Sequence, residues 1–173
     1  MRSRLKAPLI ASMTAAIVLG AFSGLAQKKG AVPFPIGYRN WTHVKTMVIY
    51  GNQHPLFKQF GGLHDVYVND LGLASLKQGE AYPDGTVFVF DLFDIHSAQG
   101  AIETRGRKFV AVMKKSAKLN PSTGGWAWEV FQGHEQKGSL QDPKPCFDCH
   151  SSQKRVDYFF STCTRDACHS AFP

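Results

Sequence analysis

Short apolar stretches, separated by turn residues, fill the middle of the chain. The strongest covers residues 86–93, where Val and Phe predominate, as is typical of a buried strand. Weaker segments of the same kind predict further strands at 44–50, 63–68, 108–113, 126–131 and 156–161. Because turns join most of these strands, we expect an antiparallel sheet with a few short helices, an α+β fold that is mainly β.

Helix and loop signals occupy the gaps between the strands. Asn69-Asp70 is a typical helix start, and this helix should run to about Gln78 and end at Gly79. The other expected elements are a helical turn at 38–41, loops at 51–62, 94–105 and 120–125, and a short helix after Pro143 and Pro145.

The first 26 residues have the pattern of an export signal. Three basic residues precede an uncharged run over 7–26 that ends in the small residues of Gly24-Leu25-Ala26. We expect a cleaved signal peptide, followed by a single domain over 27–173. An uncleaved N-terminal anchor is the alternative, because the run is about long enough to span a bilayer. Either reading places the domain outside the cytoplasm, and we expect a periplasmic protein.

Charge argues against one class of partner. The whole chain carries a net charge of +7. Without residues 1–26 it has 17 basic and 13 acidic residues, a net charge of +4. The basic residues are scattered, with no Lys/Arg block longer than two, so the sequence has no nucleic-acid-binding footprint.

The strongest chemical signal is the C-x-x-C-H motif formed by Cys146, Cys149 and His150. Two thiols at this spacing form thioethers with the two vinyl groups of one porphyrin, and the histidine becomes the proximal iron ligand. The motif therefore predicts one haem c. A zinc site is the alternative, for which Cys163, Cys168 and His169 supply the further ligands. The export signal favours haem.

A second cysteine pair lies in the C-terminal tail. Cys163 and Cys168 precede His169, which resembles a haem motif of longer spacing. Only four residues follow His169, which is little chain to cover a second porphyrin. In an oxidising compartment we favour a disulfide between Cys163 and Cys168 over a second haem, and both over a zinc or inter-subunit role.

An ordered set of short motifs carries a family resemblance. These motifs are Tyr38-Arg39-x-Trp41, His64-Asp65-Val66-Tyr67-Val68, Gly79-Glu80, Asp84-Gly85-Thr86-Val87, Gly125-Trp126-Ala127-Trp128, the C-x-x-C-H sequence and Asp157-Tyr158-x-Phe160. From about Tyr38 to Phe160 the chain resembles the cytochrome P-460 family, which includes the cytochromes c′-beta. The resemblance implies a mostly β fold, a homodimer, a haem near one end of the sheet and an iron with an open distal side.

Phe90 departs from part of that family. In members that oxidise hydroxylamine, a lysine at the matching position cross-links to the porphyrin, and phenylalanine has no nitrogen to do so. The resemblance is therefore closest to the non-cross-linked c′-beta branch, in which phenylalanine caps the distal pocket. Alternation leaves another reading open, because Phe88, Phe90 and Leu92 share one face and can be ordinary sheet core.

His64 is the second departure, since the hydroxylamine-oxidising relatives carry an arginine there. Three roles are open: the sixth iron ligand of a low-spin electron carrier, a proton donor or acceptor beside a bound small molecule, or a solvated residue on a sheet edge. The remaining histidines before the tail have no chemical partners in the pattern, and we interpret them as surface or loop residues: His43, His54, His96 and His134.

These expectations converge on a periplasmic mono-haem cytochrome. An aromatic distal pocket offers few hydrogen-bond donors, which disfavours bound oxygen but permits nitric oxide or carbon monoxide at a five-coordinate iron. We expect nitric oxide binding or detoxification, with a periplasmic electron donor or acceptor as partner. The alternatives are a six-coordinate electron-transfer cytochrome and a hydroxylamine or nitric oxide oxidoreductase.

Overall fold

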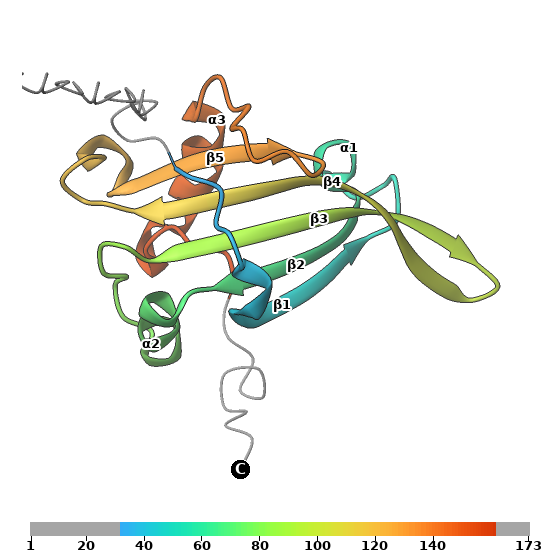
Figure 1. Ribbon diagram of the computed structural model, residues 1–173, viewed down its shortest axis with the longest axis horizontal. Helices are drawn as coiled ribbons and strands as arrows, with labels where there is room; N and C mark the ends of the chain where they lie inside the picture. The colour runs from blue at the N-terminus through green and yellow to red at the C-terminus, as the bar shows by residue number, and fades with distance from the viewer. Residues whose placement is uncertain (1–31, 162–173) are drawn as a thin grey trace, which may run out of the picture.

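Five antiparallel strands form one sheet in the computed structural model, which describes residues 32–161. The strands lie in chain order: β1 (Thr42–Ile49), β2 (Gly62–Val68), β3 (Val87–Ala98), β4 (Ala101–Lys115) and β5 (Trp126–Gln132). Each strand pairs with its predecessor, and Figure 1 shows the resulting meander. The predicted antiparallel, mainly β fold is confirmed. The predicted signal segment and the Cys163/Cys168 pair lie outside the described residues.

The helices are short and connect or cover the strands. They are η1 (Tyr38–Asn40), α1 (Phe57–Phe60), α2 (Asp70–Gln78), η2 (Pro121–Thr123), α3 (Lys144–His150) and η3 (Ser151–Val156). The described part of the chain contains no helix with the length and apolarity needed to cross a membrane.

The helix expected after Asn69 is confirmed in detail. The Asn69 side chain accepts a hydrogen bond from Gly72 N, and Gly79 ends α2 in the left-handed conformation with φ of 70°. The Asn69 side chain also accepts from Val87 N (3.1 Å) and donates to Gly85 O (2.9 Å). One capping residue therefore also attaches α2 to the start of β3.

The prediction of a loop at 94–105 is wrong. β3 and β4 continue past the core as a long hairpin, with Ile95 paired to Thr104 and Ala98 to Ala101. Gln99 and Gly100 both have positive φ (52° and 80°), as a two-residue type I′ turn requires. Most of this hairpin is exposed, so no apolar alternation marks it in the sequence, and backbone pairing alone continues the ladder.

The prediction of a last strand at 156–161 is also wrong. η3 ends at Val156, and Asp157 and Tyr158 then turn the chain in the left-handed region, with φ of 50° and 68°. Tyr158 and Phe159 are buried in the core. Their apolar character, which suggested a strand, reflects side-chain packing against the sheet and not strand pairing.

The two faces of the sheet carry separate apolar clusters. On the N-terminal face, residues 32–41 cover a cluster that includes Val89, Val110, Val112 and Phe131. On the opposite face, called the C-terminal face below, α3 and residues 157–160 pack against Val68, Phe88, Met113, Trp126 and Trp128. Figure 1 shows the blue lead-in crossing one side of the sheet and the orange-red segment from α3 onward on the other. Phe88 and Leu92 lie buried on the C-terminal face, as alternation predicted.

A buried carboxylate ties the lead-in to the N-terminal face. Asp91 is fully buried and accepts hydrogen bonds from Tyr38 Oη (2.5 Å), Arg39 Nη2 (2.9 Å) and Arg107 Nε (2.7 Å). Burial, assisted by the bond to Asp91, raises the pKa of Tyr38 to about 12. The phenol therefore stays protonated and remains a donor, so this cluster is a satisfied structural network.

Candidate functional site

The C-x-x-C-H residues lie on α3, on the C-terminal face. Pro143 and Pro145 stand at its start, where a missing backbone N–H is tolerated. Cys146 and Cys149 are three residues apart in the helix and therefore lie on the same side of it. Neither forms a disulfide within the described residues. Cys146 is half-buried against the core and burial raises the pKa of its thiol, whereas Cys149 is exposed.

His150 ends α3 with one ring nitrogen held and one available. Its Nδ1 lies 2.6 Å from the carbonyl oxygen of Tyr158. A carbonyl oxygen can only accept, so Nδ1 carries the proton and Nε2 keeps its lone pair. Burial lowers the pKa of His150, which favours the neutral ring. A neutral imidazole oriented through Nδ1–H by a backbone carbonyl is the usual state of a histidine that binds a metal through Nε2.

His64 on β2 has the reverse arrangement. Its side chain is 1% exposed, and its Nε2 lies 2.7 Å from the carbonyl oxygen of Phe60. Nε2 therefore donates, and Nδ1 is buried without a hydrogen-bond partner among the described residues. Burial lowers the pKa of His64 and keeps it neutral. The open possibility of a solvated histidine on a sheet edge is wrong, because β2 lies between β1 and β3 and the ring is enclosed.

Three phenylalanines form a cluster beside His64. The Phe90 ring lies 4.7 Å from the imidazole between ring centroids, and Phe60 lies 5.9 Å from Phe90. Phe109 on β4 lies 6.2 Å from both Phe60 and Phe90. Phe90 is only half-buried, in contrast to the fully enclosed Phe88 and Leu92 on the same face. His64 therefore lies beside an apolar aromatic cluster. Phe90, the ring of that cluster next to His64, is partly accessible.

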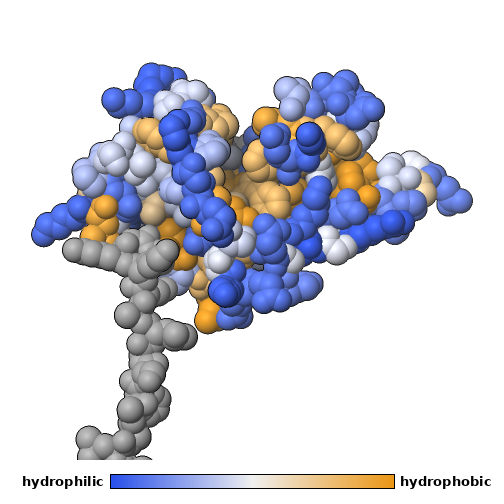
Figure 2. Space-filling view, turned by 90° about the horizontal axis from the view of Figure 1, so that it is seen from above, coloured by the Kyte–Doolittle hydropathy of each residue, from blue (hydrophilic) through white to orange (hydrophobic). Residues whose placement is uncertain are grey.

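These groups lie on the sheet face that carries the haem motif. In the register, Phe90 pairs with Val66 and Ala111, and Met113 pairs with Trp128, whose ring is 5.7 Å from that of His150. Figure 2 shows the molecule hollowed between two hydrophilic projections, on the α3 side and the α1 side, with a hydrophobic floor. His64 on β2 and Trp128 on β5 are three strands apart, a sheet width of about 14 Å.

The residues present therefore fit a haem. Two thiols one helical turn apart can reach the vinyl groups, and a neutral imidazole offers a free Nε2. The hollow has an apolar floor (Figure 2). Within 32–161, no group of three or more His, Cys, Asp or Glu residues is arranged to hold a metal ion. The further ligands that a zinc site would recruit, Cys163, Cys168 and His169, lie outside the described residues.

The sequence did not predict all of the residues around His64 and His150. Phe60 was expected in a loop, Phe109 in the strand at 108–113 with no role in the site, and the Tyr158 carbonyl in a strand. Trp128, whose Nε1–H is buried without a partner within 32–161, was part of the family motif but had no assigned role. Only their positions in space relate these groups to His64 and His150. The histidines interpreted as surface residues, His43, His54, His96 and His134, are all exposed.

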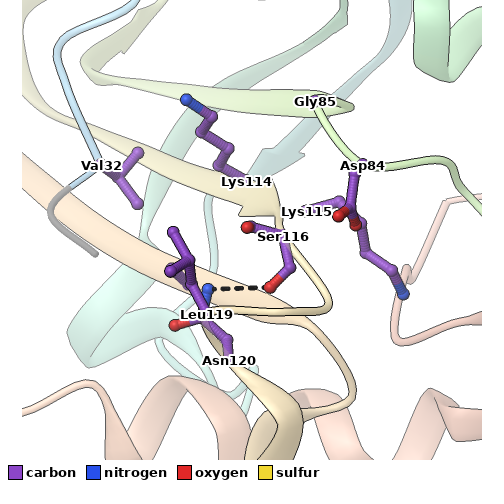
Figure 3. A pocket seen from close by; sticks show the side chains of 9 residues that line it. Val32, Asp84, Gly85, Lys114, Lys115, Ser116, Leu119 and Asn120 are labelled. Carbon is purple, nitrogen blue, oxygen red and sulfur yellow. Dashed lines mark hydrogen bonds between the residues drawn. The ribbon is translucent and has the colours of Figure 1, made fainter. Parts of the chain in front are cut away.

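A separate pocket lies away from this site. It has a volume of about 190 Å³ and is lined by residues around the β4–β5 connection, by Asp84 and Gly85, and by Val32 (Figure 3). The Asn120 side chain donates to Ser116 O at its rim (3.3 Å). None of the haem-motif residues, nor His64 or Phe90, lines this pocket.

Comparison with known proteins agrees with the geometry. No curated protein matches the chain at a significant level. The family model for cytochrome P460 matches residues 35–161, which spans the whole sheet, the aromatic surrounding of His64 and the C-x-x-C-H helix. With that match over most of its length, the chain belongs to the cytochrome P460 family and is a haem-binding cytochrome.

Proposed function

We propose that one haem c is attached through Cys146 and Cys149, with His150 as its proximal ligand, and that the exported protein binds nitric oxide or carbon monoxide on the opposite side. The haem supplies the iron that binds the ligand. The chain supplies the neutral His150 imidazole on one side and the aromatic rings around Phe90 on the other. We further propose nitric oxide binding or detoxification as the physiological role, in a periplasmic homodimer.

One observation carries the preference for these ligands. His64 donates its Nε2–H to Phe60 O, so the nitrogen that remains, Nδ1, is an acceptor. An acceptor cannot stabilise the partial negative charge of bound oxygen, and the surrounding phenylalanine rings offer no donors either. Nitric oxide and carbon monoxide depend less on donors. The pocket chemistry therefore favours these two ligands over oxygen.

Phe90 supports a binding role over hydroxylamine oxidation. It takes the place of the cross-linking lysine in the oxidising relatives, and it lies on the face that carries the hollow. Its partial exposure is what a ring that caps a distal pocket needs, while Phe88 on the same face is closed off by the Phe159 ring stacked at 3.7 Å. This supports a non-cross-linked haem, as in the c′-beta branch.

A second function has its own supporting observation. The unpartnered Nδ1 of His64 has a lone pair, and a nitrogen lone pair can close the sixth position of a haem iron. In that arrangement the protein is a six-coordinate electron-transfer cytochrome. Phe90 stands against it, since its ring packs beside the His64 ring, with 4.7 Å between the centroids.

The absorption spectrum of the purified protein tests both functions. We expect high-spin bands in the ferrous state that shift when carbon monoxide is added. Low-spin bands in both redox states, with no shift, would support the electron carrier instead. A strongly red-shifted Soret band would indicate a cross-linked haem and contradict the proposal.

The intact mass tests attachment and processing. We expect the mass of the chain without residues 1–26 plus one haem, less two hydrogens if Cys163 and Cys168 form a disulfide. Cys146→Ala with Cys149→Ala should retain haem only non-covalently, so that acidic solvent extracts it. A mass equal to the polypeptide alone would contradict covalent attachment.

A further inference from the structure

The turn that supplies the partner of His150 is conformationally unfavourable. Asp157 and Tyr158 both have positive φ (50° and 68°), although neither is glycine. Side chains with a Cβ avoid this region, and two such residues in succession need support from their surroundings. The carbonyl oxygen of Tyr158, at the end of this turn, is the acceptor for His150 Nδ1.

The Asp157 carboxylate holds the turn against the sheet. Lys115 Nζ at the end of β4 donates to both of its oxygens, at 2.7 and 2.9 Å. Tyr82 N, in the segment before β3, donates to Oδ2 (2.8 Å), and Trp126 Nε1 at the start of β5 donates to Oδ1 (3.2 Å). Three donors from three separate segments therefore fix one carboxylate.

Lys115 is itself fixed. It is 8% exposed, its Nζ also donates to Gly124 O (2.9 Å), and the ammonium lies 4.9 Å from the centroid of the Trp126 ring. Figure 3 shows Lys115 extending in the opposite direction from its neighbour Lys114. The ion pair is almost buried, with side-chain exposures of 10% for Lys115 and 14% for Asp157.

Packing closes the other side of the turn. Tyr158 and Phe159 are buried, and the Phe159 ring stacks on Phe88. A Cβ added to Gly124 would stand 2.2 Å from the Tyr158 ring, so this glycine makes room for the ring. The Tyr158 carbonyl thus has ion pairing on one side and aromatic packing on the other, which leaves it little freedom to move.

We propose that Asp157 and Lys115 are positioning residues that fix the Tyr158 carbonyl and thereby tune His150 as the proximal ligand. This inference rests on the proposed ligation of the haem iron by His150. A well-oriented Nδ1–H···O=C bond increases the electron density on Nε2 and favours ferric over ferrous iron. Loosening the turn weakens that bond, weakens the iron–histidine bond and raises the reduction potential.

The test replaces the pair in the haem-loaded protein. Asp157→Asn leaves the Lys115 ammonium buried without its counter-ion, so the variant can fail to fold. Lys115→Met with Asp157→Leu removes both charges together and avoids that problem. The two readouts are the iron–histidine stretching frequency by resonance Raman and the midpoint potential.

We expect a lower stretching frequency in the double variant. We also expect the ratio of reduced to oxidised haem at a fixed potential to rise by up to about tenfold, because the Tyr158 carbonyl is loosened but kept, and losing such a partner outright typically costs a metal site tenfold or more in affinity or activity. That change corresponds to about 59 mV for a one-electron couple. A double variant that folds with the wild-type frequency and potential would overturn the proposal and leave the pair a purely structural role.

Asp91→Asn is the matched control. Asp91, like Asp157, is a carboxylate held by three donors, but it is fully buried and lies on the N-terminal face, away from the His150 turn. It should lower the stability without changing either readout. If Asp91→Asn shifts the frequency as much as the double variant does, the effect is general loosening and the proposal fails. A wild-type ferrous protein without an iron–histidine band refutes the proposed five-coordinate haem with His150 as its one protein ligand, before any variant is compared.

Discussion

His64, which is buried, and His150, which is half-buried, make the same kind of bond through opposite nitrogens. His150 donates from Nδ1 to the Tyr158 carbonyl (2.6 Å), and His64 donates from Nε2 to the Phe60 carbonyl (2.7 Å). Burial lowers the pKa of both, so both are neutral. The nitrogen left free is Nε2 in His150, at the far end of the ring, but Nδ1 in His64, next to the side chain's own attachment point.

The supports of the two carbonyls also differ. The Tyr158 carbonyl belongs to a turn held by Asp157 and by buried aromatic rings. The Phe60 carbonyl closes the four-residue helix α1, which has no buried residue. The comparison teaches that a backbone carbonyl can assign a histidine its role by choosing which nitrogen to bind. In the proposed haem site, His150 is a firmly held ligand, and His64 presents an acceptor in a less tightly packed surrounding.

The largest effect should come from removing the rigid ligand. In His150→Ala we expect the haem to stay attached through Cys146 and Cys149 while the iron–histidine band disappears completely from the resonance Raman spectrum. His64→Ala should keep that band. An unchanged band in His150→Ala would mean that another residue binds the iron and that the two histidines have been assigned the wrong roles.

Phe90→Ala should open the space beside His64. We expect affinity for carbon monoxide to rise about tenfold and the free energy of unfolding to fall by about 2 kcal/mol, less than for a fully buried ring because Phe90 is half-buried. Phe93→Ala is the control, since Phe93 is half-buried on the same strand but packs with Arg39 and Arg107 on the N-terminal face. Equal carbon monoxide affinity in both variants and the wild type would show that Phe90 does not cap the iron.

His64→Leu should weaken the binding of ligands that donate a hydrogen bond more than the binding of ligands that cannot. Loss of the Nδ1 acceptor should leave carbon monoxide affinity within about twofold, and should weaken hydroxylamine, which can donate a hydrogen bond, by roughly threefold to tenfold. Titrations followed by absorption give both affinities. A large fall in carbon monoxide affinity would contradict the assignment of Nδ1 as a mere acceptor.

The smallest effect concerns pH. Because burial lowers the pKa of folded His64 below 6.5, the unfolded chain binds the proton more readily. This contribution to stability is complete above pH 6.5 and is lost as pH falls from there towards the folded pKa, at up to about 1.4 kcal/mol per pH unit. Denaturant unfolding at pH 7.5 and 5.5 should show a smaller loss in His64→Leu than in the wild type. The same loss in both proteins would exclude His64 as its source.

Local signals in the sequence determined several elements of the fold. Asn69 and Gly79 bound α2 as expected, since caps act through neighbouring backbone groups. Alternation over 86–93 placed Phe88 and Leu92 on one buried face. The C-x-x-C-H spacing predicts the attachment residues from nearby positions in the chain alone, and that assignment stays a prediction. The family resemblance, carried by ordered short motifs, is confirmed.

Tertiary structure alone decided the rest. The outer part of the β3–β4 hairpin has no buried face, so no apolar pattern in the sequence predicted it. The bond between Tyr82 N and Asp157 joins residues 75 positions apart, and the Lys115–Asp157 pair joins residues 42 apart. Which nitrogen of His64 or His150 stays free depends on where a distant or neighbouring carbonyl comes to lie after folding. Periodicity reports which side of a strand is buried, whereas the direction of a hydrogen bond depends on three-dimensional positions that no local pattern encodes.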